Sequence, residues 1–311
     1  MNVPDQVNLL SDACAFVQAG HQPFSFYTDL VDRLPASTAL AVRDQIVNVF
    51  DSINHLLAGA REQEQFRRSA RGVLRPTLDT LTFQPKPGDP MTASLLRASL
   101  VQELGLLGDD EVIKMCRQNF ENYLKDRTSV PADLRPPTFA IAMRYGNAVS
   151  WQKLHELGLK TTSTEDKQNY YDALAFAPDP KLIQKSLAIA LTDELPTSRA
   201  VFMVSKVARE SDRPDLAWEF AKKNAKALIA KVDAVNANSY LPSLFTFFSD
   251  PARIEELKAF AQKNLSEPSR KPVEIASDEI LFRADFRKRL IEQIQSSSRA
   301  ESRNPSVKPL R

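Results

Sequence analysis

The sequence is poor in glycine and cysteine, and it has no long apolar run. Only 8 of its 311 residues are glycine, which argues against glycine-rich phosphate-binding loops. Its 2 cysteines, Cys14 and Cys116, are too few for a disulfide framework and fit small buried hydrophobic residues. No apolar run reaches the ~18 residues that span a bilayer. Because residues 1–20 also lack the basic start of a signal peptide, we expect a soluble protein of unknown compartment.

Positive and negative charges nearly cancel, with 41 Lys and Arg against 39 Asp and Glu and a net charge of +2. Such a balance requires no polyanionic partner, and we predict neither a nucleic-acid nor a membrane partner. Basic residues do gather at helical spacing in two places. A solvated face, or one that complements a helix dipole, is favoured there over nucleic-acid binding. These clusters are Arg67, Arg68, Arg71 and Arg75, and Arg283, Arg287, Lys288 and Arg289.

Residues that carry chemistry are scarce as well. The three histidines, His21, His55 and His155, are expected on exposed helix faces. His155 and Glu156 begin like the zinc-protease motif H-E-x-x-H, but Leu159 stands where the motif needs its second histidine. No G-x-S-x-G, Walker or G-x-G-x-x-G motif occurs. We therefore predict no catalytic residue, no metal site and no cofactor in this chain.

Proline, in contrast, is abundant at 20 residues, and it recurs where helices are expected to begin. Asp179-Pro180, Arg213-Pro214 and Asp250-Pro251 each precede a helical apolar pattern. Proline suits the first helical position because its missing N–H would have no partner there. Helices that restart every few dozen residues predict an all-α superhelical solenoid of antiparallel helical hairpins, similar to HEAT or armadillo repeats.

The remaining apolar spacing extends this pattern to almost the whole chain. Pro76 implies a break or a kink in its helix, residues 80–85 are the only candidate strand, and the proline-rich segment 84–92 is interpreted as a loop. We expect one domain over 1–295, followed by a disordered tail at 296–311. The expected helical segments are 4–20, 24–34, 36–59, 62–81, 92–108, 109–126, 129–146, 150–160, 163–177, 180–191, 214–231, 239–248, 251–264 and 274–295.

Two kinds of side chain within these helices have more than one interpretation. Arg97 lies in an otherwise apolar helix, where its charge must be paired or line a cavity, and a structural ion pair is favoured over a ligand contact. Trp151 and Trp218 are followed at helical spacing by apolar residues, so core packing is favoured for both.

The order of several segments resembles the C-terminal helical domain of the gluzincin zinc aminopeptidases, the group of aminopeptidase N and the endoplasmic-reticulum aminopeptidases. Single motifs are modestly specific, but their order and spacing from about residue 5 to 295 are more so. The zinc motif of that group is absent here, so the chain resembles a fragment of such an enzyme. The segments that carry the resemblance are LLRASLVQELGLLGDDEVIKMCRQNFENYL, VPADLRPPTFAIAMRYGNAVSWQKL, TSTEDKQNYYDALAFAPDPKLIQKSLAIAL, RPDLAWEFAKKN, SDPARIEELKAFAQKN and FRADFRKRLIEQI.

The resemblance implies a noncatalytic domain that caps a catalytic domain, forms the wall of a peptide chamber and controls access and peptide length. The implied partners are that catalytic domain, which holds the zinc, and peptide substrates. Chamber-facing candidates are Arg97, Arg144, Tyr145 and Trp151. The alternative is a free-standing HEAT-like scaffold that binds another protein. Open apolar side chains near the start of the chain would favour the first hypothesis; the residues concerned are Val3, Val7, Leu10 and Phe24.

Overall fold

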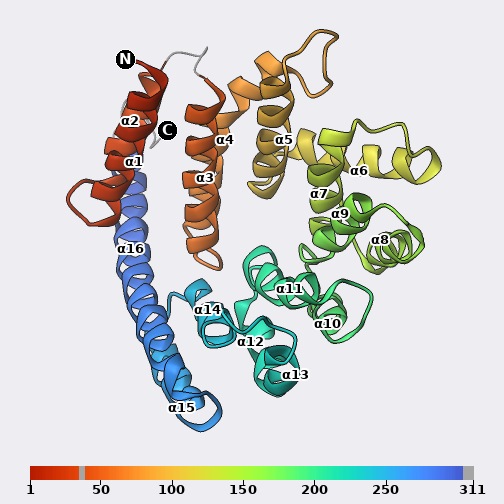
Figure 1. The fold of residues 1–311 in the computed structure, drawn as a ribbon. Helices are drawn as coiled ribbons and strands as arrows, with labels where there is room; N and C mark the ends of the chain where they lie inside the picture. The colour runs from red at the N-terminus through yellow and green to blue at the C-terminus, as the bar shows by residue number, and fades with distance from the viewer. Residues whose placement is uncertain (35–38, 304–311) are drawn as a thin grey trace. The chain divides into compact units, whose positions relative to one another are not determined.

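The computed structural model describes residues 1–34 and 39–303, and every regular element in this part of the chain is a helix (Figure 1). The all-α prediction is confirmed, and the candidate strand at 80–85 does not form.

The α-helices of the first half are α1 (Val3–Gln18), α2 (Phe24–Asp32), α3 (Leu40–Leu56), α4 (Gln63–Leu81), α5 (Met91–Leu106), α6 (Asp110–Lys125), α7 (Arg135–Arg144) and α8 (Ala148–Lys160). Those of the second half are α9 (Thr164–Leu174), α10 (Pro180–Ala188), α11 (Thr197–Glu210), α12 (Pro214–Lys223), α13 (Ala225–Ile229), α14 (Tyr240–Ser243), α15 (Arg253–Asn264) and α16 (Arg270–Arg303). Four short 3₁₀ helices accompany them, η1 (Ala132–Leu134), η2 (Ile189–Leu191), η3 (Leu244–Phe247) and η4 (Glu267–Ser269).

Two of the three proline-marked starts are confirmed to the residue. α10 begins at Pro180 and α12 at Pro214, and the side chain of Asp179 accepts hydrogen bonds from the first backbone N–H groups of α10. The third helix, α15, begins at Arg253, two residues after Pro251. Asp250 instead binds the N–H of Ala252 in the turn before it. Proline at the first helical position therefore marks two of these boundaries, and a side-chain cap is added at the start of α10.

Glycine follows the ends of two helices. Gly20 after α1 and Gly108 after α5 have φ angles of 79° and 85°, in the left-handed region that glycine adopts without strain. Beyond each glycine a backbone N–H returns to the last turn, from His21 to Phe16 and from Asp109 to Leu104. The chain can therefore reverse direction within a few residues.

Other boundaries differ from the sequence predictions. α4 continues through Pro76, so the helix does not break there, and the alternative, a kink at Pro76, stays a prediction. α8 begins at Ala148 rather than at Ser150, because the side chain of Asn147 caps it. α11 was missed altogether, although Ala200, Val204, Val207 and Ala208 have helical spacing and are buried.

The last helix is longer at both ends than expected. α16 covers 34 residues, beginning at Arg270 and ending at Arg303. Of the predicted disordered tail at 296–311, residues 296–303 continue this helix, and 304–311 lie outside the described residues.

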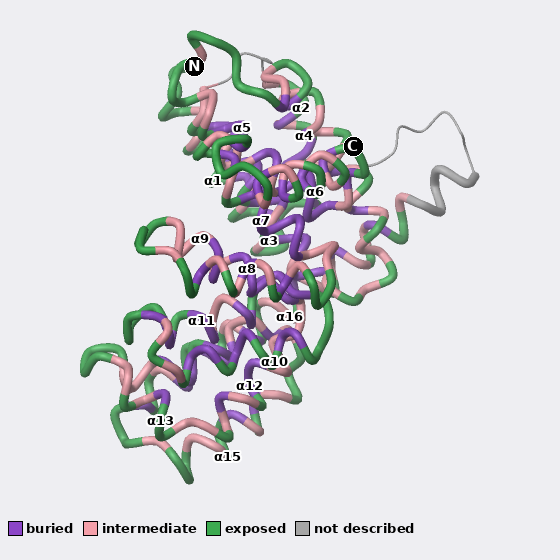
Figure 2. The backbone as a smooth tube through the Cα atoms, turned by 90° about the vertical axis from the view of Figure 1, so that its right-hand side faces the viewer, coloured by how far each residue is buried: buried purple, intermediate pink, exposed green. Residues whose placement is uncertain are grey.

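The chain divides into two compact units, each with its own buried core (Figure 2). Unit 1 comprises residues 1–138 and the chain from 286 onward, and unit 2 comprises 139–285. In both, helices pack mainly on near neighbours in the sequence, as α1 on α3, α4 on α5, α8 on α9 and α11 on α12 do. The proline-rich loop at 84–92 lies inside unit 1, between two helices that pack together. The single domain and the superhelix stay predictions.

Aromatic clusters mark the two cores. In unit 1, Phe24 contacts the rings of Tyr27, Phe50 and Phe66 at centroid distances of 6.0 to 6.3 Å. In unit 2, the ring of Trp218 lies 4.3 Å from that of Phe245 and 4.9 Å from that of Phe260. Trp218 is fully buried, which confirms its core-packing interpretation.

Candidate functional site

Arg97 is a structural anchor of unit 1. Its guanidinium is buried and donates hydrogen bonds to the carbonyls of Thr82, at 2.8 Å, and Leu81, at 3.1 Å. It also forms an ion pair with Asp89. The favoured interpretation, a structural ion pair, is confirmed. Leu81 is the last residue of α4, and Thr82 and Asp89 lie in the loop that follows it. Arg97 therefore holds the end of α4 and this loop against α5.

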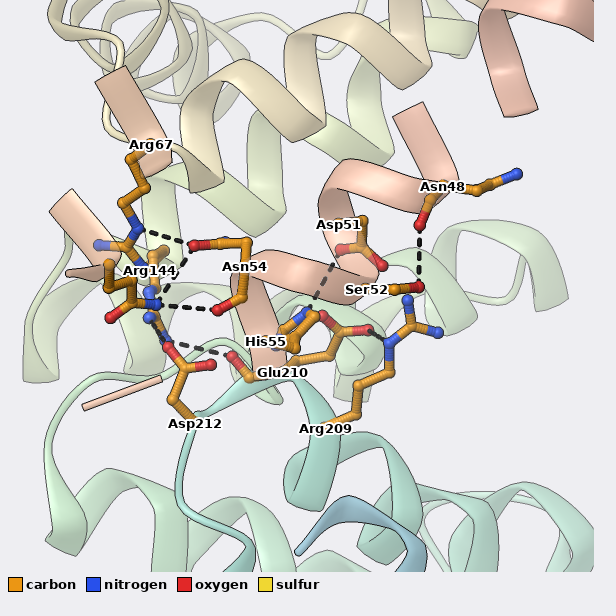
Figure 3. A network of polar contacts seen from close by, with 11 residues as sticks. Asn48, Asp51, Ser52, Asn54, His55, Arg67, Arg144, Arg209, Glu210 and Asp212 are labelled. Carbon is orange, nitrogen blue, oxygen red and sulfur yellow. Dashed lines mark hydrogen bonds and ion pairs between the residues drawn. The ribbon is translucent and has the colours of Figure 1, made fainter. Parts of the chain in front are cut away.

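Arg144 and Tyr145 lie at the end of α7 with partly exposed side chains. The guanidinium of Arg144 donates a hydrogen bond of 3.1 Å to the carbonyl of Glu210 and pairs with Asp212 (Figure 3). Asp212 has a positive φ of 57°. The arginine therefore stabilises the turn that follows α11.

Trp151 is buried, and its favoured role in core packing is confirmed. Its indole N–H binds the hydroxyl of Ser186, and its ring lies 4.8 Å from that of His155. The ammonium of Lys185 lies 5.4 Å from the ring centroid, close enough for a cation–π interaction.

Three arginines of the two basic clusters complement helix ends, as the sequence suggested, whereas Arg75 pairs with carboxylates. Arg71 donates to the carbonyl of Leu107 after α5. Arg287 donates to the carbonyl of Leu56 in α3, and Arg289 donates to those of Val17 and Gln18 in α1. A guanidinium supplies several donors to C-terminal carbonyls that have no partner within their helix, and it offsets the negative end of the helix dipole.

The prediction of exposed histidines holds for His21 and is wrong for the other two. His55 lies within an ion-pair distance of Asp51, at 3.3 Å. Nε2 of His155 lies 2.6 Å from a carboxylate oxygen of Glu194, which also accepts a hydrogen bond from Tyr171 at 2.7 Å. Helix periodicity already places Asp51 one turn from His55 in α3, but it could not reveal Glu194, which lies 39 residues from His155.

Two kinds of feature are absent from the described residues, a cluster of metal ligands and a membrane-spanning helix. No three His, Cys, Asp or Glu side chains come together there as a metal site would require. None of the helices described is long and apolar enough to cross a bilayer. Both cysteines are free, and burial raises the pKa of the Cys116 thiol to about 12. This burial fits the sequence interpretation of a small hydrophobic side chain.

The surface of α1 and α2 carries exposed apolar side chains. Four residues near the start of the chain were to distinguish a domain that docks on a catalytic domain from a free-standing scaffold. Of these, Val3 is exposed, Val7 is half-buried, and Leu10 and Phe24 are buried. Other apolar residues of the same helices are exposed instead. They are Leu9 and Phe16 of α1, with exposed fractions of 39% and 51%, and Phe26 of α2, with 42%.

Leu9 and Phe16 lie seven residues apart and therefore on one face of α1. Asp5, one turn before Leu9, and Asp12, between Leu9 and Phe16, are exposed on the same face. The face thus combines apolar side chains with negative charge. We refer to Asp5, Leu9, Asp12 and Phe16 as the α1 face. Such a face fits a partner surface that is apolar and basic.

Comparison with known proteins places these features in a family. The family profile described as "ERAP1-like C-terminal domain" matches residues 1–281. Aminopeptidase M1 of Arabidopsis thaliana is 24% identical over 232 residues, which is 70% of this chain and 26% of that protein. Aminopeptidase M1-D of Oryza sativa subsp. japonica is 25% identical over 268 residues, 84% of this chain and 30% of that protein. Glutamyl aminopeptidase of Mus musculus is 23% identical over 265 residues, 83% and 28% respectively. The chain thus spans less than a third of the length of these relatives.

Proposed function

Because the chain belongs to the family of ERAP1-like C-terminal domains, we propose that it serves a zinc aminopeptidase as its noncatalytic part. In this role it caps the catalytic domain and forms the wall of the chamber that holds the peptide. It thereby controls access to the zinc and selects peptides by length. The observation that carries the proposal is the family match over residues 1–281.

The zinc in this proposal belongs to the catalytic domain. The sequence contains no H-E-x-x-H motif, and the residue that begins its partial match, His155, is bonded to the carboxylate of Glu194. The residues of this chain therefore do not fit a catalytic zinc site of that kind. Their proposed contribution is to shape and close the chamber.

The exposed α1 face supports a docked arrangement. Single exposed apolar residues need no explanation, but Leu9 and Phe16 share one face, and Phe26 is exposed on α2, which packs on α1. A catalytic domain that covered this face would remove the apolar side chains from water. We propose it as part of the surface on which the catalytic domain rests.

The four chamber candidates divide by their burial. Arg144 and Tyr145 are partly exposed and are proposed to contact the distal part of a peptide. Arg97 and Trp151 are buried, so their proposed role is to hold the wall in shape.

The test begins with the gene. An H-E-x-x-H motif encoded upstream of this chain is expected. In the protein that contains both parts, cleavage of a short fluorogenic substrate and of a long peptide would then be compared for Leu9→Asp and Phe16→Asp. We expect the ratio of long-peptide to short-substrate cleavage to change several-fold, because a buried charge would weaken docking by about 1–3 kcal/mol.

Val235→Asp is the matched control. It adds the same charge at a position of unit 2 where the valine is 88% exposed. A gene without the zinc motif would contradict the proposal. It would favour the alternative, a free-standing scaffold whose α1 face binds another protein.

A further inference from the structure

Unit 2 contains a pocket at the start of α9 and α11. One side is made by Thr161–Thr164 and the first turns of α9, and the other by Leu195, Pro196 and the first turns of α11. Its volume is about 400 Å³, which lies within the range of ~300–1,000 Å³ that is usual for small-molecule sites. The pocket is therefore large enough for an organic ligand rather than for water alone.

Of the three charged side chains that line the pocket, only the negative one has an ion-pair partner among the described residues. Lys167 of α9 and Arg199 of α11 both line it, and neither forms an ion pair with another residue of the described chain. The lining carboxylate of Asp172 is already paired, because the ammonium of Lys206 lies 2.7 Å from it. Two uncompensated positive charges therefore remain, and they favour an anionic occupant.

The rest of the lining combines apolar side chains with hydroxyl and amide groups. Tyr171, Leu195 and Met203 are buried, whereas Phe202 lines the same pocket with 56% of its surface exposed. A large exposed aromatic ring beside a pocket offers a stacking surface for an apolar group. Hydroxyl groups, such as that of Ser198, add neutral hydrogen-bonding capacity to the lining.

Polar contacts hold one wall of the pocket in place. Glu194, which directly precedes Leu195 and Pro196, is bonded to His155 and to the hydroxyl of Tyr171. Two residues earlier, the carbonyl of Thr192 accepts a hydrogen bond of 2.9 Å from Lys231. A wall fixed in this way does not have to be ordered when a ligand binds, which lowers the cost of binding.

We infer that this pocket binds a small carboxylate that carries an aromatic or branched aliphatic group. The carboxylate pairs with Lys167 and Arg199, and the apolar group packs on Phe202 and Leu195. The inference goes beyond the proposed function, because it assigns a ligand site to unit 2 alone and requires no catalytic domain.

The test measures binding of two matched probes to the 311-residue chain by isothermal titration calorimetry. 3-Phenylpropionate carries the carboxylate, and 3-phenylpropionamide has nearly the same shape without the charge. We expect the acid to bind about tenfold more tightly than the amide, and its affinity to fall as salt screens the two cations. Equal binding of acid and amide would overturn the inference.

Single substitutions locate the site. Lys167→Gln and Arg199→Gln should each weaken binding of the acid by about two- to fivefold, and Phe202→Ala should weaken binding of both probes. Lys263→Gln is the control, because Lys263 is an exposed cation of unit 2 outside the lining. All four positions are at least partly exposed, and circular dichroism would verify that the variants fold. Full affinity in the Lys167→Gln/Arg199→Gln double variant would refute the assignment.

A third probe identifies where the carboxylate comes from. A capped hexapeptide with adjacent Phe and Glu presents the same two groups within a polypeptide. Binding of 3-phenylpropionate but not of this peptide identifies a free small-molecule acid, as the inference holds. Binding of the peptide alone contradicts it and points to a protein segment.

Discussion

The indole N–H of Trp151 in α8 donates a hydrogen bond of 2.9 Å to the hydroxyl oxygen of Ser186 in α10. The same hydroxyl donates its own proton to the carbonyl of Leu174 in α9, at 2.8 Å. Ser186 is fully buried and Trp151 is 5% exposed. One small side chain thus satisfies polar groups of two other helices at a place shielded from water.

Ser186→Ala should destabilise the protein by about 2–3 kcal/mol, because the indole N–H and the Leu174 carbonyl would each lose a buried partner. Chemical denaturation followed by circular dichroism measures the change. Ser52→Ala is the control: Ser52 is exposed, and its hydroxyl donates a hydrogen bond to the Asn48 carbonyl of its own helix (Figure 3). A loss of stability no larger than that of the control would show that water replaces the missing hydroxyl.

Two glycines within helices should respond in opposite ways to alanine. A Cβ at Gly158 in α8 would lie 2.4 Å from the ring of the buried Tyr171 in α9, whereas a Cβ at Gly72 in α4 would meet nothing within 4 Å. Gly158→Ala should therefore destabilise the protein by about 1–3 kcal/mol or more. Gly72→Ala should stabilise it by about 0.5–1 kcal/mol, because alanine is the better helix former. Thermal melting of both variants tests this, and a shift of the same sign would contradict it.

Arg289→Met should reduce the free energy of unfolding by about 1–2 kcal/mol. The guanidinium donates hydrogen bonds to the carbonyls of Val17, at 2.9 Å, and Gln18, at 2.6 Å, and thereby ties α16 to the end of α1. Lys288→Met removes an exposed cation from the next position and should change stability by less than about 0.5 kcal/mol. Similar effects of both substitutions in urea denaturation would mean that only the charge of this segment matters.

Glu256 should make stability depend on pH in acid. Burial alone would raise its pKa, but hydrogen bonds from Lys222, Arg253 and Trp218 favour the carboxylate and lower the pKa from 4.5 to about 2. Because the folded-state pKa is depressed, the stabilisation is fully present above about pH 4.5. It is lost as the pH falls from there to about 2. With allowance for solvent screening, its size is about 1–2 kcal/mol.

Glu256→Gln should therefore lower stability at pH 7 and flatten its decline between pH 4.5 and 2. Denaturation at a series of pH values gives both quantities. Glu255→Gln alters the neighbouring carboxylate, whose side chain is 82% exposed, and should leave the curve as it is in the unmodified protein. A Glu256→Gln curve parallel to the unmodified one would assign the acid sensitivity to other carboxylates.

Much of the fold could be predicted because helix boundaries depend on nearby residues. The starts at Pro180 and Pro214 and the ends at Gly20 and Gly108 need only local backbone chemistry. α11 is not among the predicted helices, although its buried apolar residues have helical spacing in the sequence. The continuity of α4 through Pro76 was not readable in this way, because the packing of α4 on α5 and α3 outweighs the local penalty of proline.

The sequence by itself determined the helical class and, through its segment order, the family. It also limited Arg97 to a pair or a cavity, since a buried charge cannot be left alone. Only the tertiary structure decided which of these applied, by bringing Asp89 and two carbonyls to the guanidinium. In the same way, it alone joined His155 to Glu194 and brought Lys167 and Arg199 to one pocket. Helix periodicity shows which side of a helix is buried, but contacts between distant residues depend on how the helices pack.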